Sequence, residues 1–364
     1  MKRAVLLLAL AACVDAAPAV REAPLATQTS AIQSGAEDAS SSFAVAIFDE
    51  DENICSGVLI APNLVLTARH CVAEGGGDPI DCTIDRFDAP REAKTFHVTT
   101  DATARADEAP YAVSKVLVPT TQLFCGNDIA LLVLDKNVPA AVAIPATPAI
   151  DPPLTDRTKY GTKVTAIGYG TTGPSAWDDG TRRRRDDIPF ACIPGDKQLG
   201  CTPADYEITD TELAAGDGLC SGDSGSGAFV PSSLASGGPI VVGVLSRAAE
   251  YQGKCVDAVY SRTDSFGPFL IEGAKEAATA GGYAVPSWAA PQTAEPTDAS
   301  VAPPPPPVDG GVSSEAGTPA AAPSDDDGGC TITPGQRPQN SAIWAAIAAI
   351  GLVVGWHRRR RTVS

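Results

Sequence analysis

The sequence predicts an all-β fold for most of this 364-residue chain. Short apolar runs rich in Val, Ile and Leu are separated by Gly, Pro, Asp and Asn, which is typical of β-barrels and β-sandwiches. The chain also contains 34 Gly and 31 Pro, too many for a mostly helical protein. The predicted strands are residues 43–48, 57–68, 114–118, 129–134, 163–169, 225–230 and 240–246.

Only one stretch, residues 265–278, predicts a helix. Pro268 lies near its start, where the missing backbone N–H has no intrahelical acceptor to lose. We therefore expect one domain over residues 32–280, with a short helix at its C-terminal end.

Charge and cysteine content exclude two classes of protein. Lys and Arg number 27 against 44 Asp and Glu, a net charge of −17, so the chain lacks the basic surface that binds nucleic acid. Ten Cys and a single Met, the initiator, indicate an oxidising compartment and argue against a cytosolic enzyme.

The N-terminus predicts export. Residues 1–3 are basic at two positions, and residues 4–10 are an apolar run too short to span a bilayer, so residues 1–16 are expected to be a signal peptide. The sequence Leu-Ala-Ala-Cys ending at Cys13 resembles the bacterial lipobox, whose Cys is lipidated. The alternative is ordinary cleavage nearby, for example after Ala16, which discards Cys13. Residues 17–31 would then form a short pro-segment.

The C-terminal part has a different composition. Residues 281–329 are rich in Pro, Ala and Asp and are expected to form a semi-extended linker. Residues 330–364 contain Cys330, an apolar run over residues 341–356, and four arginines after it. At about 1.5 Å per residue that run spans about 24 Å, short of the roughly 30 Å hydrocarbon core. This tail resembles the sorting tails of myxobacterial surface proteins, which are removed; a plain membrane anchor is the alternative.

Three short segments of the β region carry chemistry. His70 lies in Thr-Ala-Arg-His-Cys, Asp128 in Asn-Asp-Ile-Ala-Leu-Leu, and Ser224 in Cys-Ser-Gly-Asp-Ser-Gly-Ser-Gly. Acyl transfer needs a hydroxyl nucleophile, an imidazole base and a carboxylate that orients the imidazole. Each segment alone could be structural: a core His, a turn at Asn-Asp, or a glycine-rich loop. Their order in the chain makes the combination more specific.

Together these segments resemble the chymotrypsin/trypsin-like serine protease family, over residue 32 to about residue 271. His70 matches the family's Thr-Ala-Ala-His-Cys, with Arg69 in place of the second Ala. Asp128 matches Asp-Ile-Ala-Leu-Leu, and Ser224 matches Gly-Asp-Ser-Gly-Gly-Pro with Ser-Gly in place of the final Gly-Pro. His97 lies in no motif and is expected at the surface.

The resemblance implies a fold, an activity and further site residues. The fold is two antiparallel six-stranded β-barrels with a short C-terminal helix, and the activity is peptide-bond hydrolysis by a monomer without cofactor or metal. The N–H groups of Gly222 and Ser224 would form the oxyanion hole. Ser246 matches the family Ser that hydrogen-bonds the triad Asp and borders the substrate-binding strand.

The same resemblance implies the position of the specificity pocket. Gly218, six residues before the nucleophile, would lie at its base, with Ala248 and Ala258 on the walls. These small side chains favour small or medium apolar residues before the cleaved bond. The alternative is that Asp217 or Arg247 turns inward and places a charge in the pocket.

The family also suggests how the cysteines pair. Cys55 with Cys71 would lie beside the His, and Cys220 with Cys255 would brace the specificity pocket. Cys192 with Cys201 would close a loop in the second barrel, which leaves Cys82 with Cys125 and no family counterpart for that pair. A metal site is the competing interpretation, but the chain has no Cys-x-x-Cys pair to support one.

The start at Ile32 predicts activation by cleavage. Ile-Gln-Ser-Gly resembles the family's mature start, Ile-Val-Gly-Gly, and in the family the new α-ammonium pairs with the Asp before the nucleophile, here Asp223. Because Ala31 precedes the cut, a trypsin-like activator is not expected, whereas self-activation by a small-residue-specific enzyme would fit. The alternative is a constitutively active chain. The arginines at residues 182–185 are expected in a solvated variable loop, with a self-cleavage site as the alternative.

The sequence thus predicts an exported bacterial serine endopeptidase, at the cell surface, in the outer membrane or extracellular, that acts on proteins or peptides. A catalytically inactive, protease-like surface binding protein is the main alternative. An esterase would instead have Gly-x-Ser-x-Gly on a strand-to-helix turn and its His last in the chain, and the order here is different.

Overall fold

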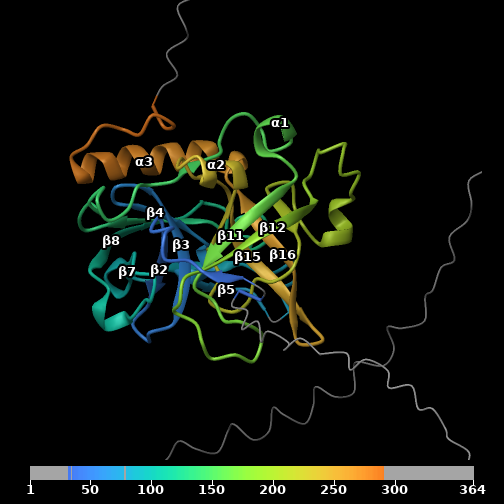
Figure 1. Cartoon of the computed structure of the whole chain (residues 1–364), viewed down its shortest axis with the longest axis horizontal. Helices are drawn as coiled ribbons and strands as arrows, with labels where there is room; N and C mark the ends of the chain where they lie inside the picture. Colours follow the sequence, from blue (N-terminus) through green and yellow to red (C-terminus); the bar gives the residue numbers. More distant parts are fainter. Residues whose placement is uncertain (1–31, 34, 78, 291–364) are drawn as a thin grey trace, which may run out of the picture. The chain divides into compact units, whose positions relative to one another are not determined.

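The computed structural model of the chain describes residues 32–33, 35–77 and 79–290. These residues form two closed six-stranded barrels and a C-terminal helix, α3 (Gly267–Gly281). In Figure 1 the blue and teal strands of the first barrel lie beside the green to orange strands of the second. The predicted fold, two antiparallel six-stranded barrels followed by a helix, is confirmed.

The first barrel is built from the N-terminal half of the domain. Its strand order is β2 (Ala44–Phe48), β3 (Ile54–Ala61), β4 (Leu64–Thr67), β9 (Ala130–Leu134), β8 (Tyr111–Leu117) and β7 (His97–Thr99). Every residue of β2, β4 and β9 is buried, so these strands are continuous apolar runs rather than alternating ones. The run at residues 57–68, expected to be one strand, is a hairpin that turns at Pro62 and Asn63.

The second barrel holds the remaining long strands. Its order is β11 (Lys163–Gly168), β14 (Gly227–Phe229), β15 (Ile240–Tyr251), β16 (Lys254–Arg262), β13 (Glu212–Ala215) and β12 (Arg183–Cys192), and β12 pairs with β13 to close it. Two short strands join its outside: β1 (Ala36–Glu37) pairs with β12, and β10 (Thr147–Pro148) pairs with β15. Strand β1 therefore joins the second barrel although it precedes the first in the sequence.

Short elements lie between the barrel strands and after them. They are β5 (Ala73–Gly75), β6 (Phe87–Pro90), α1 (Arg157–Tyr160), α2 (Pro231–Ala235), and the 3₁₀ turns η1 (Arg69–Cys71), η2 (Ala93–Thr95), η3 (Ala106–Glu108), η4 (Pro203–Tyr206) and η5 (Asp264–Phe266). The small sheet of β5 and β6 stands apart from both barrels. These turns matter for function because η1 carries His70.

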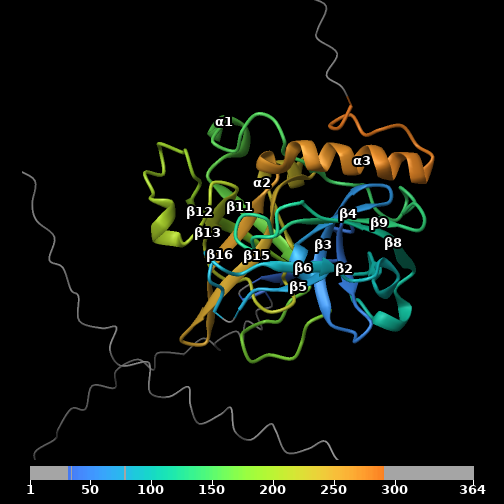
Figure 2. The same cartoon turned by 180° about the vertical axis from the view of Figure 1, so that it is seen from behind.

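Helix α3 packs on the first barrel (Figure 2). It begins at Gly267 with Pro268 in its first turn and buries Leu270, Ala274 and Ala277, close to the expected limits. Packing continues past the expected end of the domain, because Tyr283 Oη donates a hydrogen bond to Asn63 Oδ1 over 2.6 Å and Ala289 is buried.

No helix among residues 32–33, 35–77 and 79–290 is long and apolar enough to cross a bilayer. The expected signal peptide and pro-segment, the expected linker from residue 291 onward and the apolar run at residues 341–356 lie outside the described residues.

The arginine run at residues 182–185 is not a solvated loop, and that expectation was wrong. Arg183 opens strand β12, and Arg182 and Arg183 are only 2% and 6% exposed. Burial is possible because neutral oxygens satisfy the guanidinium N–H groups. Arg182 donates to the carbonyl oxygens of Asp38, Ala39, Ala44 and Thr100 and to the hydroxyl of Tyr169.

Candidate active site

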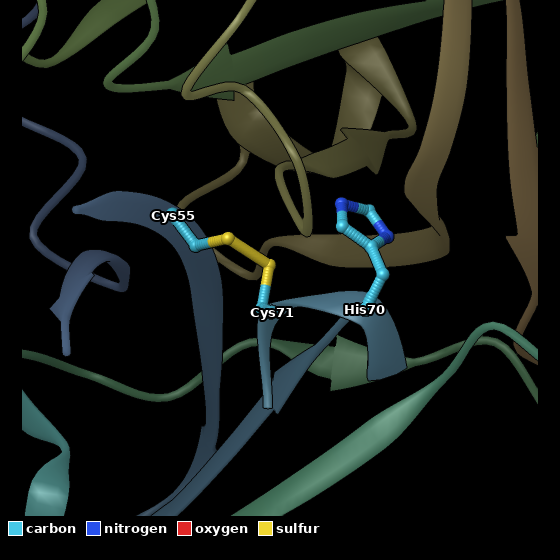
Figure 3. Close-up of side chains that lie close together, drawn as sticks. All are labelled: Cys55, His70 and Cys71. Atoms are coloured by element: carbon cyan, nitrogen blue, oxygen red, sulfur yellow. A yellow bond between two sulfur atoms is a disulfide. The ribbon is translucent and has the colours of Figure 1, made fainter. Parts of the chain in front are cut away.

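His70 lies in η1, the single 3₁₀ turn that follows strand β4. The disulfide Cys55–Cys71 fixes this turn to strand β3. Figure 3 shows the disulfide and the imidazole of His70 side by side. The position of the ring is thus set by a covalent link one residue away, and its side chain remains 24% exposed.

Asp128 is fully buried next to His70, two residues before strand β9. Its Oδ2 lies 2.8 Å from Nδ1 of His70, and its Oδ1 accepts the backbone N–H of His70 over 2.9 Å. Ser246 Oγ donates a third hydrogen bond to Oδ2 over 2.6 Å. These contacts place the proton of a neutral His70 on Nδ1 and leave Nε2 as the acceptor.

The contact between Asp128 and His70 shifts the pKa values of the two side chains in opposite directions. Burial raises the pKa of Asp128, but the charge of His70 and the hydrogen bonds from His70 and Ser246 outweigh it, so the pKa lies below the ordinary value. Burial lowers the pKa of His70, but the charge of Asp128 and its hydrogen bond outweigh this effect, so the pKa lies above 6.5. An ionised Asp128 therefore stabilises an imidazolium at His70.

Ser224 lies in the glycine-rich loop between β13 and β14, in the other barrel. Ser56 of β3 holds this loop at two points: its N–H donates to Ser224 O over 2.8 Å, and its Oγ donates to Gly222 O over 2.9 Å. Cys71 Sγ lies 3.7 Å from Ser224 O. The loop is thereby held against the segment that carries His70. Within the described residues the side chain of Ser224 makes no hydrogen bond to His70.

The two N–H groups expected to form the oxyanion hole have no hydrogen-bond acceptor in the described part of the chain. Within residues 32–33, 35–77 and 79–290, neither the N–H of Gly222 nor that of Ser224 donates to an acceptor. Gly222 has φ +85°, a conformation that glycine adopts without strain. Neither N–H group is therefore engaged within this part of the chain.

The expected pocket residues lie on neighbouring strands and loops of the second barrel. Gly218 and Ala258 are buried, Ala248 is exposed, and the N–H of Gly218 donates to Cys255 O over 2.8 Å. Of the two charged alternatives, Asp217 is exposed and accepts the N–H of Asp257 over 3.3 Å.

Arg247 is paired with a carboxylate and a carbonyl oxygen. Its Nη1 pairs with Glu212 over 2.6 Å, and its Nη2 donates to Glu207 O over 2.7 Å. Glu212 is itself fully buried, so this pair fixes the arginine on strand β15.

Ile32 and Asp223 are both buried in the second barrel. Ile32 belongs to the same core cluster as Leu219 and Tyr260. The Asp223 carboxylate accepts the N–H groups of Gly170 and Cys220 over 2.8 and 2.9 Å. Burial raises the pKa of Asp223 to about 7, although these hydrogen bonds and the charge of Arg183 lower it.

The four cysteine pairs expected from the sequence are the four disulfides of the structure, Cys55–Cys71, Cys82–Cys125, Cys192–Cys201 and Cys220–Cys255. Ligand atoms of Cys55, His70 and Cys71 lie within 4.8 Å of one another. They do not make a metal site, because the two sulfur atoms are bonded to each other and Nδ1 of His70 faces Asp128.

Several residues that shape the site were not predicted. Ser56 holds the nucleophile loop, and Ser261 Oγ donates to the backbone oxygen of Asp128 over 2.7 Å. Arg69 is 3% exposed and donates to the carbonyl oxygens of Pro119 and Thr121. No motif marks these residues, although the departure of Arg69 from the family pattern was a signal. His97 is exposed, as expected.

Comparison with known proteins gives a consistent result. The family described as Trypsin matches residues 32–270. Brachyurin of Leptuca pugilator is 31% identical over 187 residues, which cover 50% of this chain and 72% of that protein. Kallikrein 1-related peptidase b8 of Mus musculus is 28% identical over 220 residues, which cover 57% of this chain and 78% of that protein.

Proposed function

Because the chain belongs to the trypsin family of serine proteases, we propose that it is an exported serine endopeptidase whose catalytic residues are His70, Asp128 and Ser224. The observation that carries this proposal is the Asp128 carboxylate, which is fully buried and accepts hydrogen bonds from both the backbone and the ring of His70. A surface ion pair or a turn Asp would not need that arrangement. The four disulfides are consistent with export.

In the proposed reaction Ser224 Oγ attacks the carbonyl carbon of the peptide bond while Nε2 of His70 takes the hydroxyl proton. The carbonyl oxygen becomes an anion and accepts the N–H groups of Gly222 and Ser224. The C–N bond then breaks, His70 returns the proton to the leaving amine, and an acyl-enzyme ester remains at Ser224. Water, deprotonated by His70, hydrolyses that ester by the same steps.

Peptide hydrolysis by matched serine variants tests this assignment. Ser224→Ala should reduce kcat by at least about 10³-fold, because the nucleophile is lost. Ser221→Ala, which changes an exposed serine three residues away in the same loop, should stay near the wild-type rate. Equal activity of Ser224→Ala and the wild type would refute the proposed nucleophile. If neither folded protein hydrolyses peptides, the inactive binding protein becomes the better description.

We further propose that Gly218, Ser246, Ala248 and Ala258 border the pocket for the side chain before the cleaved bond. The support is their position around the segment that leads to the nucleophile: the N–H of Gly218 donates to Cys255 O, and Ala258 pairs with Ala215 across strands β16 and β13. Cys220–Cys255 joins the two sides of this region.

Activation by cleavage before Ile32 is also proposed. The Asp223 carboxylate is fully buried, and no described Lys or Arg lies within 4 Å of it, so it lacks a cationic partner. A new α-ammonium at Ile32 would supply that partner, and breaking such a buried pair costs about 3–5 kcal/mol. N-terminal sequencing of the active form decides the matter: we expect a start at Ile32, and full activity in a form that retains earlier residues would contradict it.

The rest of the chain is assigned on sequence alone. We propose a signal peptide over residues 1–16, a pro-segment over residues 17–31, a linker after the protease domain and a sorting tail over residues 330–364. The enzyme would then act on protein or peptide substrates outside the cytoplasm, attached to a membrane through its tail or through a lipid on Cys13.

A further inference from the structure

The guanidinium of Arg185 lies directly against Gly218, the proposed base of the substrate pocket. A Cβ built on Gly218 would overlap Nη1 of Arg185 and lie 2.6 Å from its Cζ and 2.9 Å from Gln33 O. Gly218 also has φ +109°, which disfavours any other residue. The space that a side chain at position 218 would need is therefore filled by a positive charge from strand β12.

This positive charge is not neutralised by a neighbour. Arg185 is half-buried, and its hydrogen bond is from Nη1 to Gln33 O over 2.6 Å. No carboxylate of residues 32–33, 35–77 and 79–290 lies within 4 Å of it. The two acidic residues that follow it are paired elsewhere, Asp186 with Arg184 over 2.8 Å and Asp187 with Lys163 over 3.0 Å.

A buried hydroxyl without a partner lies in the same region. Tyr260 of strand β16 is fully buried, and its hydroxyl has no hydrogen-bond partner in the described part of the chain. Burial and the charge of Asp223 raise the pKa of Tyr260, while the charge of Arg185 lowers it. The phenol stays protonated at neutral pH and within the field of Arg185, so it can donate to an anion.

From this geometry we infer that Arg185 is a specificity-determining residue and that the enzyme prefers a carboxylate side chain, Glu or Asp, before the cleaved bond. The inference rests on the proposed peptidase function and pocket. An apolar side chain would cover a half-buried guanidinium without replacing its lost water, which is unfavourable, whereas a carboxylate provides charge-assisted hydrogen bonds. A Lys or Arg side chain would be repelled.

A positive charge at Arg185 alters two expectations that were based on the small side chains lining the pocket. The small side chains of Ala248 and Ala258 limit the size of the substrate side chain. Among side chains of that size, the charge of Arg185 favours an acidic one over an apolar one. An enzyme that prefers Glu would also cut slowly after Ala31, so the cut before Ile32 would be made by another peptidase.

Four peptides that differ only in the residue before the cleaved bond, Glu, Gln, Ala or Arg, test the inference. Wild-type kcat/KM for the Glu peptide should exceed that for its uncharged isostere Gln by about tenfold or more, the range of a charge-assisted hydrogen bond. In Arg185→Gln the Glu-to-Gln ratio should fall to about one. Arg184→Gln is the matched control, because Arg184 pairs with Asp186 on the same strand, and its ratio should stay at the wild-type value.

Wild-type rates for Glu no greater than for Gln, or greatest for Arg, would overturn the inference, as would a Glu preference that survives in Arg185→Gln. Arg185→Met, which keeps an unbranched stem without the charge, takes its place if the Gln variant does not fold. A fluorophosphonate probe separates the two proposals. Labelled protein that cleaves peptides without a Glu preference refutes only the role of Arg185, whereas folded protein that is neither labelled nor active refutes the peptidase function and this inference with it.

Discussion

At the scale of single residues, an aromatic stack beside His70 connects it to the buried Arg69. The Arg69 guanidinium lies 4.5 Å from the ring centre of Phe87, Phe87 stacks on Phe124 at 4.6 Å, and Phe124 stacks on the His70 ring at 6.3 Å. The proposed triad follows from sequence motifs alone. The stack of aromatic rings could not be predicted, because its members are distant in sequence and Arg69 occupies a position where the family has Ala.

The Asp128–His70 pair predicts the pH dependence of hydrolysis. His70 must be neutral to accept the Ser224 proton, and its pKa is raised above 6.5, so kcat/KM should fall as the pH drops through a midpoint above 6.5. A pH profile of kcat/KM with one peptide measures this midpoint. A midpoint below 6.5 would mean that Asp128 does not stabilise the imidazolium in solution.

The role of Asp128 can be measured separately. Asp128→Asn keeps the size of the side chain but favours the wrong tautomer of His70, and such a change lowers kcat by about 10⁴-fold. Ser246→Ala removes a single hydrogen bond to Asp128 and should have a much smaller effect, about tenfold. Similar losses in both variants would show that the buried Ser246 contributes more than orientation.

At the scale of elements, the loop of the second barrel that carries Ser224 packs against strand ends of the first barrel. A Cβ on Gly225, the residue after the nucleophile, would overlap Thr67 Oγ1 and Ser56 O and lie 3.0 Å from Ala68 N. Gly225 also has φ +79°. The loop can therefore approach the His70 segment only because this position has no side chain.

Gly225→Ala should consequently lower both stability and activity. The overlap adds to the cost of about 1–2 kcal/mol for an L residue in this conformation, and it moves Ser224 away from His70. Gly237→Ala is the matched control, because Gly237 has φ +77° with open space around it. Urea unfolding and kcat/KM compare the two variants. Equal stability losses and unchanged activity in both would contradict the proposed fit of the loop.

The sequence predicted strands well where they are continuous apolar runs and missed strands that carry charged residues, such as β12, β13 and β16. Strands β2 and β9 are apolar runs in the sequence, whereas β12 begins Arg-Arg-Arg-Asp-Asp and was expected to be a loop. Arg182, just before β12, and Arg185, within it, donate to carbonyl oxygens on distant segments, Thr100 for Arg182 and Gln33 for Arg185. Long-range partners of this kind leave no trace in local composition, so the function proposed for Arg185 required the structure.

At the scale of the whole molecule, the start of the domain and the nucleophile loop meet in the second barrel. Strand β1 pairs with β12 of that barrel, Ile32 belongs to its core, and Asp223 is buried near Tyr260. The first barrel supplies His70 and Asp128. We expect a cut before Ile32 to change the conformation of the loop that carries Gly222 and Ser224, through Asp223, while leaving the first barrel unchanged.

The uncleaved form should lose stability as the pH rises. The pKa of Asp223 is raised from 3.8 to about 7 in the folded chain, so between pH 4 and 7 the folded state binds more protons than the unfolded state. Stability then falls with pH, by an amount on the order of 4 kcal/mol for a shift of about three units. Urea unfolding of the uncleaved Ser224→Ala protein at several pH values measures this slope.

Asp223→Asn in the same background is the control for that slope. Asn cannot ionise, so the contribution of this residue to the pH dependence should disappear. In the cleaved form the α-ammonium favours the ionised carboxylate and should also remove the decline. A slope that is the same with Asp and Asn at position 223 would contradict the pKa shift.

The central claim, that Ser224 is an activated nucleophile, is tested most directly by a fluorophosphonate probe on the folded mature protein. Peptide mass spectrometry should locate one adduct at Ser224, with labelling lost in Ser224→Ala and retained in Ser221→Ala. Labelling should also be lost when the protein is unfolded in urea, because activation depends on His70 and Asp128 being in place. A folded mature protein that stays unlabelled, or an adduct elsewhere that survives Ser224→Ala, would contradict the account.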